Sequence, residues 1–183
     1  IEMSLLNHDI DLAVHSHKDL ETTPPEGLKI AAVSSRENPC ELLLIRKGAH
    51  DANELWELKK NAIVGTSSAR RKSQLLALRS DVEIKDLRGN VPTRVEKLKS
   101  GEYDAILLAK AGVLRLNLDL SDLICVDLTP DEFVPAPAQG VLALQIRSQD
   151  IELDRILQQI NDSEVQKLVH LEREVLSLMN GGC

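Results

Sequence analysis

Residues 62–90 read AIVGTSSARRKSQLLALRSDVEIKDLRGN, which contains a short apolar run, a helical segment and a second apolar run. The pattern predicts a strand at 62–64, a helix at 68–79 and a strand at 82–85. A strand, a helix and a strand in succession are typical of parallel sheets whose faces are covered by helices. The stretch therefore predicts the α/β class.

The same alternation continues on both sides of this stretch. Apolar runs predict further strands at 11–15, 28–33, 41–46, 104–109 and 141–146. Helices are predicted at 54–60, where Asn53 would be the N-cap, in a segment ending near 101, and at 151–160 and 163–179. Aromatic residues make up only 2% of the chain. Aliphatic side chains must therefore fill the core, which favours covered parallel strands over an antiparallel sandwich.

Two polar segments with proline interrupt the alternation. Residues 34–39 read SSRENP, and residues 129–137 carry three prolines in nine positions. The segment between them is long enough for a domain of its own. A chain that leaves one domain, builds a second and returns would have this layout, but so would one domain with two surface loops.

Composition excludes several classes of protein. No stretch approaches the roughly 20 apolar residues of a membrane helix, and a net charge of −7 argues against nucleic acid as a partner. The three cysteines are far apart in sequence, which fits neither a disulfide framework nor a CxxC metal site. His15 and His17 have no partner at metal-ligand spacing, so no metal is expected. A reducing cytoplasm is the simplest compartment.

Cationic residues are concentrated in one part of this acidic chain. The window 66–94 contains seven Lys or Arg and three Asp or Glu residues, which gives it a net charge of +4. A basic window in an acidic protein indicates a site for a small anion. A solvated helix face with ordinary turns would have the same composition.

Two motifs in this window have the arrangement of anion sites. VGTSSARR (64–71) is a strand end, a glycine turn, three hydroxyl residues and a predicted helix start. LRGNVPTR (87–94) repeats the pattern with a Gly-Asn turn and two arginines six residues apart. Backbone N–H groups, hydroxyls and guanidinium groups there would bind a carboxylate or phosphate. The spacing is not that of a Walker loop.

Two further motifs carry chemistry-bearing side chains. VHSHKD (14–19) places Ser, Lys and Asp at a predicted strand end, where ligand crevices lie in open α/β sheets. Asp19 could stabilise a cationic intermediate there, or it could be a turn residue. The chain ends in GGC (181–183). Cys183 is either an ordinary thiol behind a helix-capping glycine pair or a nucleophile on a loop.

These four motifs, together with LAKAGVLRL (108–116) and PAPAQGVLALQIR (135–147), resemble the porphobilinogen deaminase family in order and over the whole length. The resemblance implies a transferase of tetrapyrrole (haem) biosynthesis. It would condense four porphobilinogen molecules into linear hydroxymethylbilane, with release of ammonia, on a covalently bound dipyrromethane primer. The implied partner is this small substrate, bound by a monomer.

The resemblance also implies the fold. It consists of two periplasmic-binding-protein-like (type II) α/β domains, joined by two hinge segments, plus a small α+β third domain. Residues 1–37 and 135–152 would form domain 1, residues 38–134 domain 2, and residues 153–183 the start of domain 3. The chain would then be a fragment that lacks the N-terminal segment and most of domain 3, and weak or no turnover is expected from it alone.

Individual residues acquire roles from the same resemblance. Asp19 matches the family's catalytic aspartate, and Cys183 matches the cysteine that carries dipyrromethane through a thioether. Other positions match cofactor-binding residues, namely Ser16, Lys18, Thr66, Ser67, Ser68, Arg70, Arg71 and Arg88. The matches to substrate-binding positions are Arg94, Arg115 and Gln139.

Departures from the family pattern are few. His17 stands where the motif usually has an apolar residue, and Ala138 replaces a common glycine before Gln139.

Two alternatives to the enzyme remain open. One is a non-catalytic anion-binding module of the periplasmic-binding type, and the other is an inactive truncated copy of the enzyme.

Overall fold

The computed structural model describes residues 1–179, which form two compact units. Unit 1 contains residues 1–38 and the segment from 136 onward, and unit 2 contains residues 39–135. Each unit has its own sheet. Within residues 1–179, no helix has the length and apolar character needed to cross a membrane.

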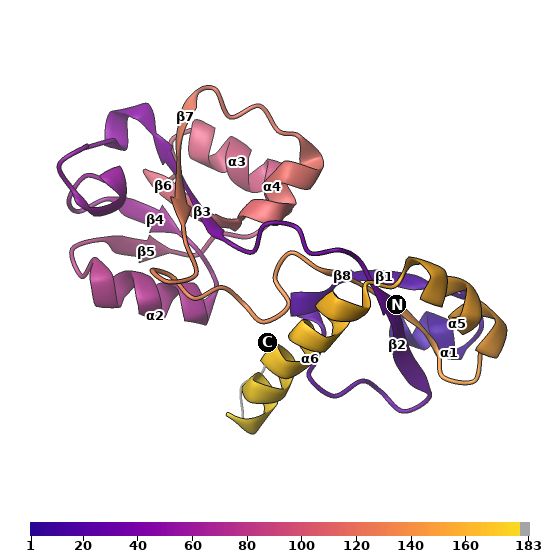
Figure 1. Ribbon diagram of the computed structural model, residues 1–183. Coiled ribbons are helices and arrows are strands. Elements are labelled where there is room, and N and C mark those ends of the chain that lie inside the picture. Colours follow the sequence, from indigo (N-terminus) through magenta and orange to yellow (C-terminus); the bar gives the residue numbers. More distant parts are fainter. Residues whose placement is uncertain (180–183) are drawn as a thin grey trace. The chain divides into compact units, whose positions relative to one another are not determined.

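Unit 2 is built on a five-stranded sheet with the order β5-β4-β6-β3-β7 (Figure 1). The strands are β3 (Glu41–Arg46), β4 (Ile63–Gly65), β5 (Glu83–Lys85), β6 (Ala105–Ala109) and β7 (Leu123–Leu128). The helices are α2 (Ala69–Leu78), α3 (Val91–Lys99) and α4 (Lys110–Leu116).

The sheet of unit 2 is mixed, which corrects the expectation of a purely parallel sheet. β4 runs parallel to β5 and β6, whereas β3 runs antiparallel to β6 and β7. The helices α2, α3 and α4 connect the parallel strands in succession, as crossover connections require. β3 is entered directly from residues 34–39, and the described chain between β3 and β4 forms 3-10 turns rather than a crossover helix.

Helices cover both faces of this sheet. Leu43 and Ile45 of β3 are fully buried in a cluster with Leu75 of α2. Leu44, whose side chain points to the opposite face, packs in a second cluster with Val95 of α3 and other residues of α3 and α4. This alternation along β3 follows from the two-residue period of a strand. Both faces are apolar, as the sequence predicts for a covered strand.

Unit 1 contains a three-stranded antiparallel sheet in which β8 (Leu142–Arg147) lies between β1 (Ala13–Ser16) and β2 (Leu28–Val33). Its helical elements are α1 (Glu2–Leu6), α5 (Ile151–Leu157), α6 (Ser163–Leu178) and the 3-10 turns η1 (His17–Asp19) and η4 (Gln158–Ile160). α5 and α6 contact β2. The assignment of residues 153–183 to a third domain stays a prediction.

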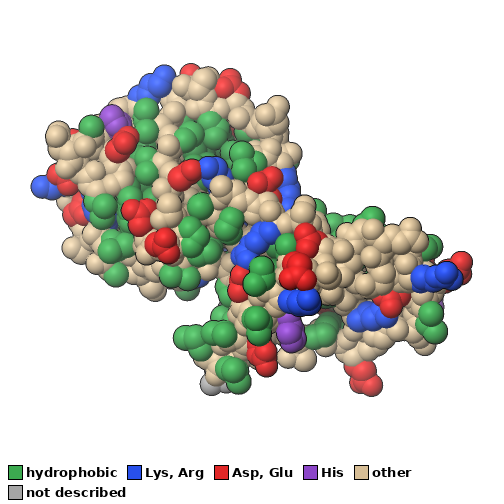
Figure 2. Space-filling view, viewed as in Figure 1, with side chains coloured by type: hydrophobic (Ala, Val, Ile, Leu, Met, Phe, Trp, Pro, Cys, Tyr) green, Lys and Arg blue, Asp and Glu red, His purple; other side chains and the backbone are tan. Residues whose placement is uncertain are grey.

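α6 is packed against the rest of unit 1 along only part of its surface. Val169 is buried against Val33, whereas Leu171, Val175 and Leu178 are more than half exposed. Figure 2 shows hydrophobic side chains at the surface over the second half of this helix. The helix predicted at 163–179 is therefore present, with several large apolar side chains of its second half left at the surface.

The prediction of a helix at 54–60 is wrong. A 3-10 turn, η3 (Leu55–Glu57), occupies this segment, and Trp56 and Glu57 have positive φ angles of 59° and 56°. These angles turn the Trp56 ring inward, where it packs edge-on against Phe133 with 5.8 Å between ring centroids. Burial of a large aromatic side chain outweighs the local helical pattern here. α4 and β7 were not predicted from the sequence.

The segments through which the chain leaves and re-enters unit 1 are hydrogen-bonded to each other. The Glu37 N–H donates to Gly140 O at 2.9 Å, and the Ser34 N–H donates to Leu142 O at 3.0 Å. Gly140 has a φ of +86°, and a Cβ atom there would lie 2.2 Å from Glu37 O. Ala138, at a position where the family commonly has glycine, has a φ of 59°.

We expect Gly140→Ala to lower the free energy of unfolding by about 2 kcal/mol or more, because the new methyl group meets a backbone oxygen and the residue must keep a left-handed φ. Urea unfolding followed by circular dichroism measures this loss.

Gly48→Ala is the matched control, because a Cβ atom at Gly48 meets nothing within 4 Å. We expect this variant to stay within about 1 kcal/mol of the unaltered protein. Equal stability of the two variants would contradict the close contact described at Gly140.

Candidate functional site

The two arginine-containing motifs lie side by side at one edge of the unit 2 sheet. β4 and β5 are parallel neighbours, so residues 66–71 and 87–94, which follow their carboxyl ends, emerge at the same edge. The Ser67 hydroxyl donates to Leu87 O at 3.1 Å and accepts from the Leu87 N–H at 3.0 Å. This reciprocal pair joins the two loops and makes them one surface.

Side-chain caps start both helices at this edge. Ser68 caps α2 by accepting from the Arg71 N–H, and Asn90 caps α3 by accepting from the Thr93 N–H at 3.0 Å. The Thr66 hydroxyl accepts from the Ser68 N–H at 3.3 Å. Such caps are typical of hydroxyl and amide residues before a helix. The hydroxyls predicted as ligand groups thus also fix the loop that carries them.

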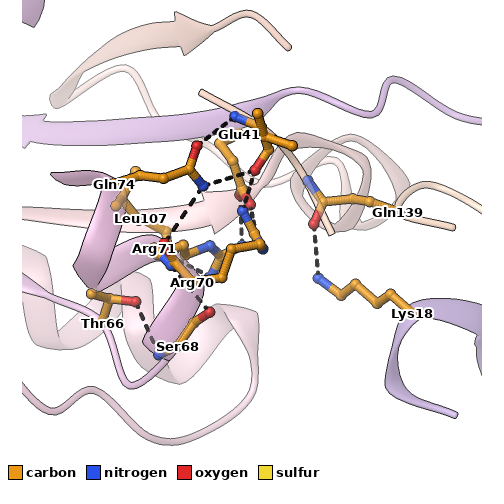
Figure 3. Close-up of polar contacts among 10 residues, drawn as sticks. Lys18, Glu41, Thr66, Ser68, Arg70, Arg71, Gln74, Leu107 and Gln139 are labelled. Atoms are coloured by element: carbon orange, nitrogen blue, oxygen red, sulfur yellow. Dashed lines mark hydrogen bonds and ion pairs between the residues drawn. The ribbon is translucent and has the colours of Figure 1, made fainter. Parts of the chain in front are cut away.

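Arg70 and Arg71 converge on one buried carboxylate, that of Glu41 at the start of β3 (Figure 3). Arg70 Nη2 lies 2.5 Å from Oε1, and Arg71 Nη2 lies 2.6 Å from Oε2. Burial opposes ionisation of Glu41, but attraction and hydrogen bonds from Arg71 and Arg70 outweigh it, so the pKa of Glu41 lies below its ordinary value. The carboxylate is therefore ionised and fully paired.

The two arginines differ in exposure and in their remaining partners. The Arg71 side chain is 7% exposed, and its Nη1 donates to Leu107 O at 3.1 Å. The Arg70 side chain is 27% exposed, and its Nη1 donates to Val134 O at 2.6 Å. Burial lowers the pKa of Arg70, although Glu41 opposes this shift. Arg70 is therefore the member of the pair that a ligand could reach.

The other predicted arginines lie nearer the surface. Arg88 is exposed, and Arg94 is half-buried with its Nε donating to Gly89 O at 2.7 Å. Arg115 is exposed in the last turn of α4, the helix that follows β6. β6 is parallel to β4, so α4 starts at the same edge as α2 and α3.

The motif in unit 1 lies where β1 ends. Ser16 is the last residue of β1, and Lys18 and Asp19 follow in η1. Lys18 Nζ donates to Oε1 of the buried Gln139 at 3.3 Å (Figure 3). Arg36 Nε donates to Gln139 O at 3.0 Å. Ser16 and Asp19 are exposed. Cys183, the predicted attachment point, lies outside the described residues.

His17 is a buried histidine between these exposed residues. Its side chain is buried, and burial and then the charge of Arg173 lower its pKa to about 4, while Glu172 opposes the shift. Within the described chain its Nδ1 has no hydrogen-bond partner. His17 is therefore neutral at pH 7 and occupies the apolar position of the family motif without adding charge.

Glu41 and Gln74 were not among the residues predicted from sequence. Glu41 opens the apolar run 41–46, where an acidic side chain at a buried strand position indicates a need for a cationic partner. Gln74 lies one turn after Arg70, and its side-chain amide pairs with both backbone groups of Val134. No sequence signal identifies Gln74. Among the described residues, no cluster of three metal-ligating side chains is present.

Comparison with known proteins identifies relatives over the whole chain. The family model "Porphobilinogen deaminase, dipyromethane cofactor binding domain" matches residues 1–155. The chain is 45% identical over 183 residues to porphobilinogen deaminase of Bacillus pumilus and 45% identical to that of Thermus thermophilus. All of the chain is covered, but only 57% and 59% of these two relatives. The chain thus spans somewhat more than half of their length.

A solved structure resembles the fold. The ancestral cationic amino acid solute binding protein AncCDT-1 matches with a TM-score of 0.50 and 17% identity, covering 91% of this chain and 71% of that structure. The likeness concerns the fold alone. Together with the two mixed α/β units, it confirms the expected periplasmic-binding-protein-like type II fold.

The low pKa of His17 predicts a pH-dependent stability. The unfolded chain binds a proton on this side chain near pH 6.5 and the folded chain near pH 4, so stability is lost as the pH falls between these values. The difference corresponds to about 3 kcal/mol. We expect His17→Leu to remove this part of the loss, as measured by urea unfolding from pH 7 to pH 4.5.

His170→Leu, which removes an exposed histidine of the same unit, is the control and should keep the slope of the unaltered protein. If His17→Leu keeps that slope as well, another group is responsible for the loss.

Proposed function

The chain belongs to the porphobilinogen deaminase family, and we propose that the protein of which it is a part condenses four porphobilinogen molecules into linear hydroxymethylbilane. The reaction releases ammonia and serves tetrapyrrole biosynthesis. The family model identifies residues 1–155 as a dipyrromethane cofactor-binding domain. The proposed enzyme is therefore a transferase that builds its product on dipyrromethane.

The carrying observation is the pair of hydrogen bonds between Ser67 and Leu87, which joins both arginine-rich loops into one surface. Arg88 lies on the second of these loops, and Arg70 and Arg94 lie in the first turns of α2 and α3, the helices that follow the two loops. Each porphobilinogen unit brings two carboxylates, so a growing chain is a polyanion. Guanidinium groups and helix-capping loops are suited to such a ligand.

The donor set fits the proposed cofactor, because its carboxylates match guanidinium and hydroxyl donors. The residues proposed to hold these carboxylates are Ser16, Lys18, Thr66, Ser67, Ser68, Arg70, Arg71 and Arg88, with Cys183 as the attachment point. When bound, the cofactor supplies the pyrrole end to which new units are added. Arg94, Arg115 and Gln139 would hold the incoming substrate.

Asp19 would carry the chemical step. Loss of ammonia from porphobilinogen leaves an electron-poor pyrrole, and a carboxylate close to the pyrrole N–H stabilises the positive charge. Asp19 is exposed at the end of β1, next to Lys18, which is hydrogen-bonded to Gln139. Its carboxylate is therefore within reach of a ligand. We further propose a cytoplasmic monomer that acts on this small molecule and binds neither nucleic acid nor membrane.

We expect Asp19→Asn in the full-length protein to lower the rate of hydroxymethylbilane formation by about 100-fold or more, because the variant keeps the shape of the side chain but loses its charge. Intact mass should still show the dipyrromethane adduct. Turnover is measured from the absorbance of the oxidised porphyrin product.

Asp9→Asn, an exposed aspartate of the same unit, is the control and should keep normal turnover. Normal turnover in Asp19→Asn would rule out Asp19 as the catalytic group. An unmodified thiol at Cys183 in the full-length protein would favour a non-catalytic anion-binding module instead.

A further inference from the structure

Glu41 binds both members of the Arg70–Arg71 pair and is itself inaccessible. Each carboxylate oxygen receives one guanidinium, and the side chain is 0% exposed. We propose that Glu41 is a positioning residue for carboxylate binding, acting through Arg70, which it holds in one orientation. The inference rests on the proposed role of Arg70 in binding carboxylates.

The need for such a residue follows from the charges. Arg70 and Arg71 are neighbours on the first turn of α2, and both are drawn into the same region of unit 2. Two cations there repel each other, and an arginine without a fixed partner samples many rotamers. A single ionised carboxylate between them removes the repulsion and leaves the group of three with a net charge of +1.

A second set of contacts fixes the other terminal nitrogen of the Arg70 guanidinium group. Its Nη1 donates to Val134 O at 2.6 Å, and Gln74 brackets the same residue, with Nε2 donating to Val134 O at 3.0 Å and Oε1 accepting from the Val134 N–H at 2.8 Å. Arg71 is fixed in turn by Leu107 O. One guanidinium is thus held between a carboxylate and a backbone carbonyl.

Arg70 is partly exposed, so it can contact a ligand while Glu41 holds it in place. With 27% of the side chain exposed, Arg70 can meet a ligand without leaving Glu41, whereas the 7% exposed Arg71 acts as a support. Preorganised donors bind more tightly because their side-chain entropy is lost on folding rather than on binding. Glu41 would therefore increase the affinity for an anion although it is itself an anion.

This consequence separates positioning from simple electrostatics. If charge alone mattered, removal of a carboxylate beside the site would strengthen the binding of an anion. If Glu41 positions Arg70, its removal weakens the binding. The probe is porphobilinogen, whose carboxylates are of the same kind as those that Arg70 is proposed to hold in the cofactor. It is titrated calorimetrically into full-length protein that carries Cys183→Ser, so that covalent loading does not interfere.

We expect Glu41→Gln to raise the Kd for porphobilinogen at least tenfold. Glu41→Asp keeps the charge but is one methylene shorter and does not reach both guanidinium groups, so a several-fold rise is expected with a smaller loss of stability. Because Glu41→Gln leaves the buried Arg71 and the partly exposed Arg70 poorly paired, this variant can fail to fold. Glu41→Asp alone therefore also decides the question. An unchanged or lower Kd in Glu41→Asp would overturn the proposal.

Asp81→Asn is the matched control. Asp81 forms the corresponding pair with another buried arginine of the same unit, Arg79, through contacts of 2.8 Å and 2.7 Å. Asp81 is 31% exposed, but its removal likewise leaves a buried arginine without its carboxylate, so the variant is expected to lose stability and to keep the Kd. A rise in Kd in this control equal to that in Glu41→Asp would show a general loss of structure and would overturn the positioning role.

Arg70→Gln separates the carboxylate-binding role of Arg70 from the positioning role of Glu41. We expect it to raise the Kd at least as much as Glu41→Gln does. If it leaves the Kd unchanged, the carboxylate-binding role of Arg70 fails and the inference fails with it. If Arg70→Gln weakens binding and neither Glu41 variant does, only the positioning role of Glu41 fails.

Discussion

A single buried carboxylate organises the candidate site of unit 2. Glu41 opens β3, and there it lies opposite Ala109 of β6 and Leu128 of β7. It therefore stands at the edge where the arginine-rich loops emerge. Burying an ionised carboxylate is unfavourable unless cations and hydrogen bonds surround it. The fold meets this condition with Arg70 and Arg71, so the stability of the sheet edge and the geometry of the site depend on the same contact.

Local patterns predicted the elements that have a local cause. The helices α2 and α3 were predicted from the alternation of short apolar strands and helical segments, and in the structure each starts at a capping side chain, Ser68 or Asn90. The direction of β3 and β8 was not predictable, since it depends on where the chain enters each sheet. The conformation of Trp56 depends on Phe133, a residue far away in the sequence. Tertiary packing decides such features.

Some features of the candidate residues could also be predicted from local sequence, and others depend on tertiary packing. Asp19, Arg70 and Arg88 belong to short motifs, and the place of each motif after a strand of its own unit could be predicted from the order of strands and helices. The pairing of Arg71 with Glu41 could not, because a strand and a helix separated in sequence supply the two partners. The neutral state of His17 likewise could not be predicted, because it follows from burial and from the charge of Arg173, a residue of α6. Sequence predicted which residue types gather, and packing determines which of them remain accessible.

The hydrogen bond between Glu37 and Gly140 has an architectural consequence. It holds together the two ends of unit 1 between which residues 39–135 are inserted. An insertion whose entry and exit points are adjacent barely perturbs its host, because the chain closes at nearly the same place with or without it. Unit 2 is thus an inserted domain, and a short turn in its place would leave the order of the three strands of unit 1 unchanged.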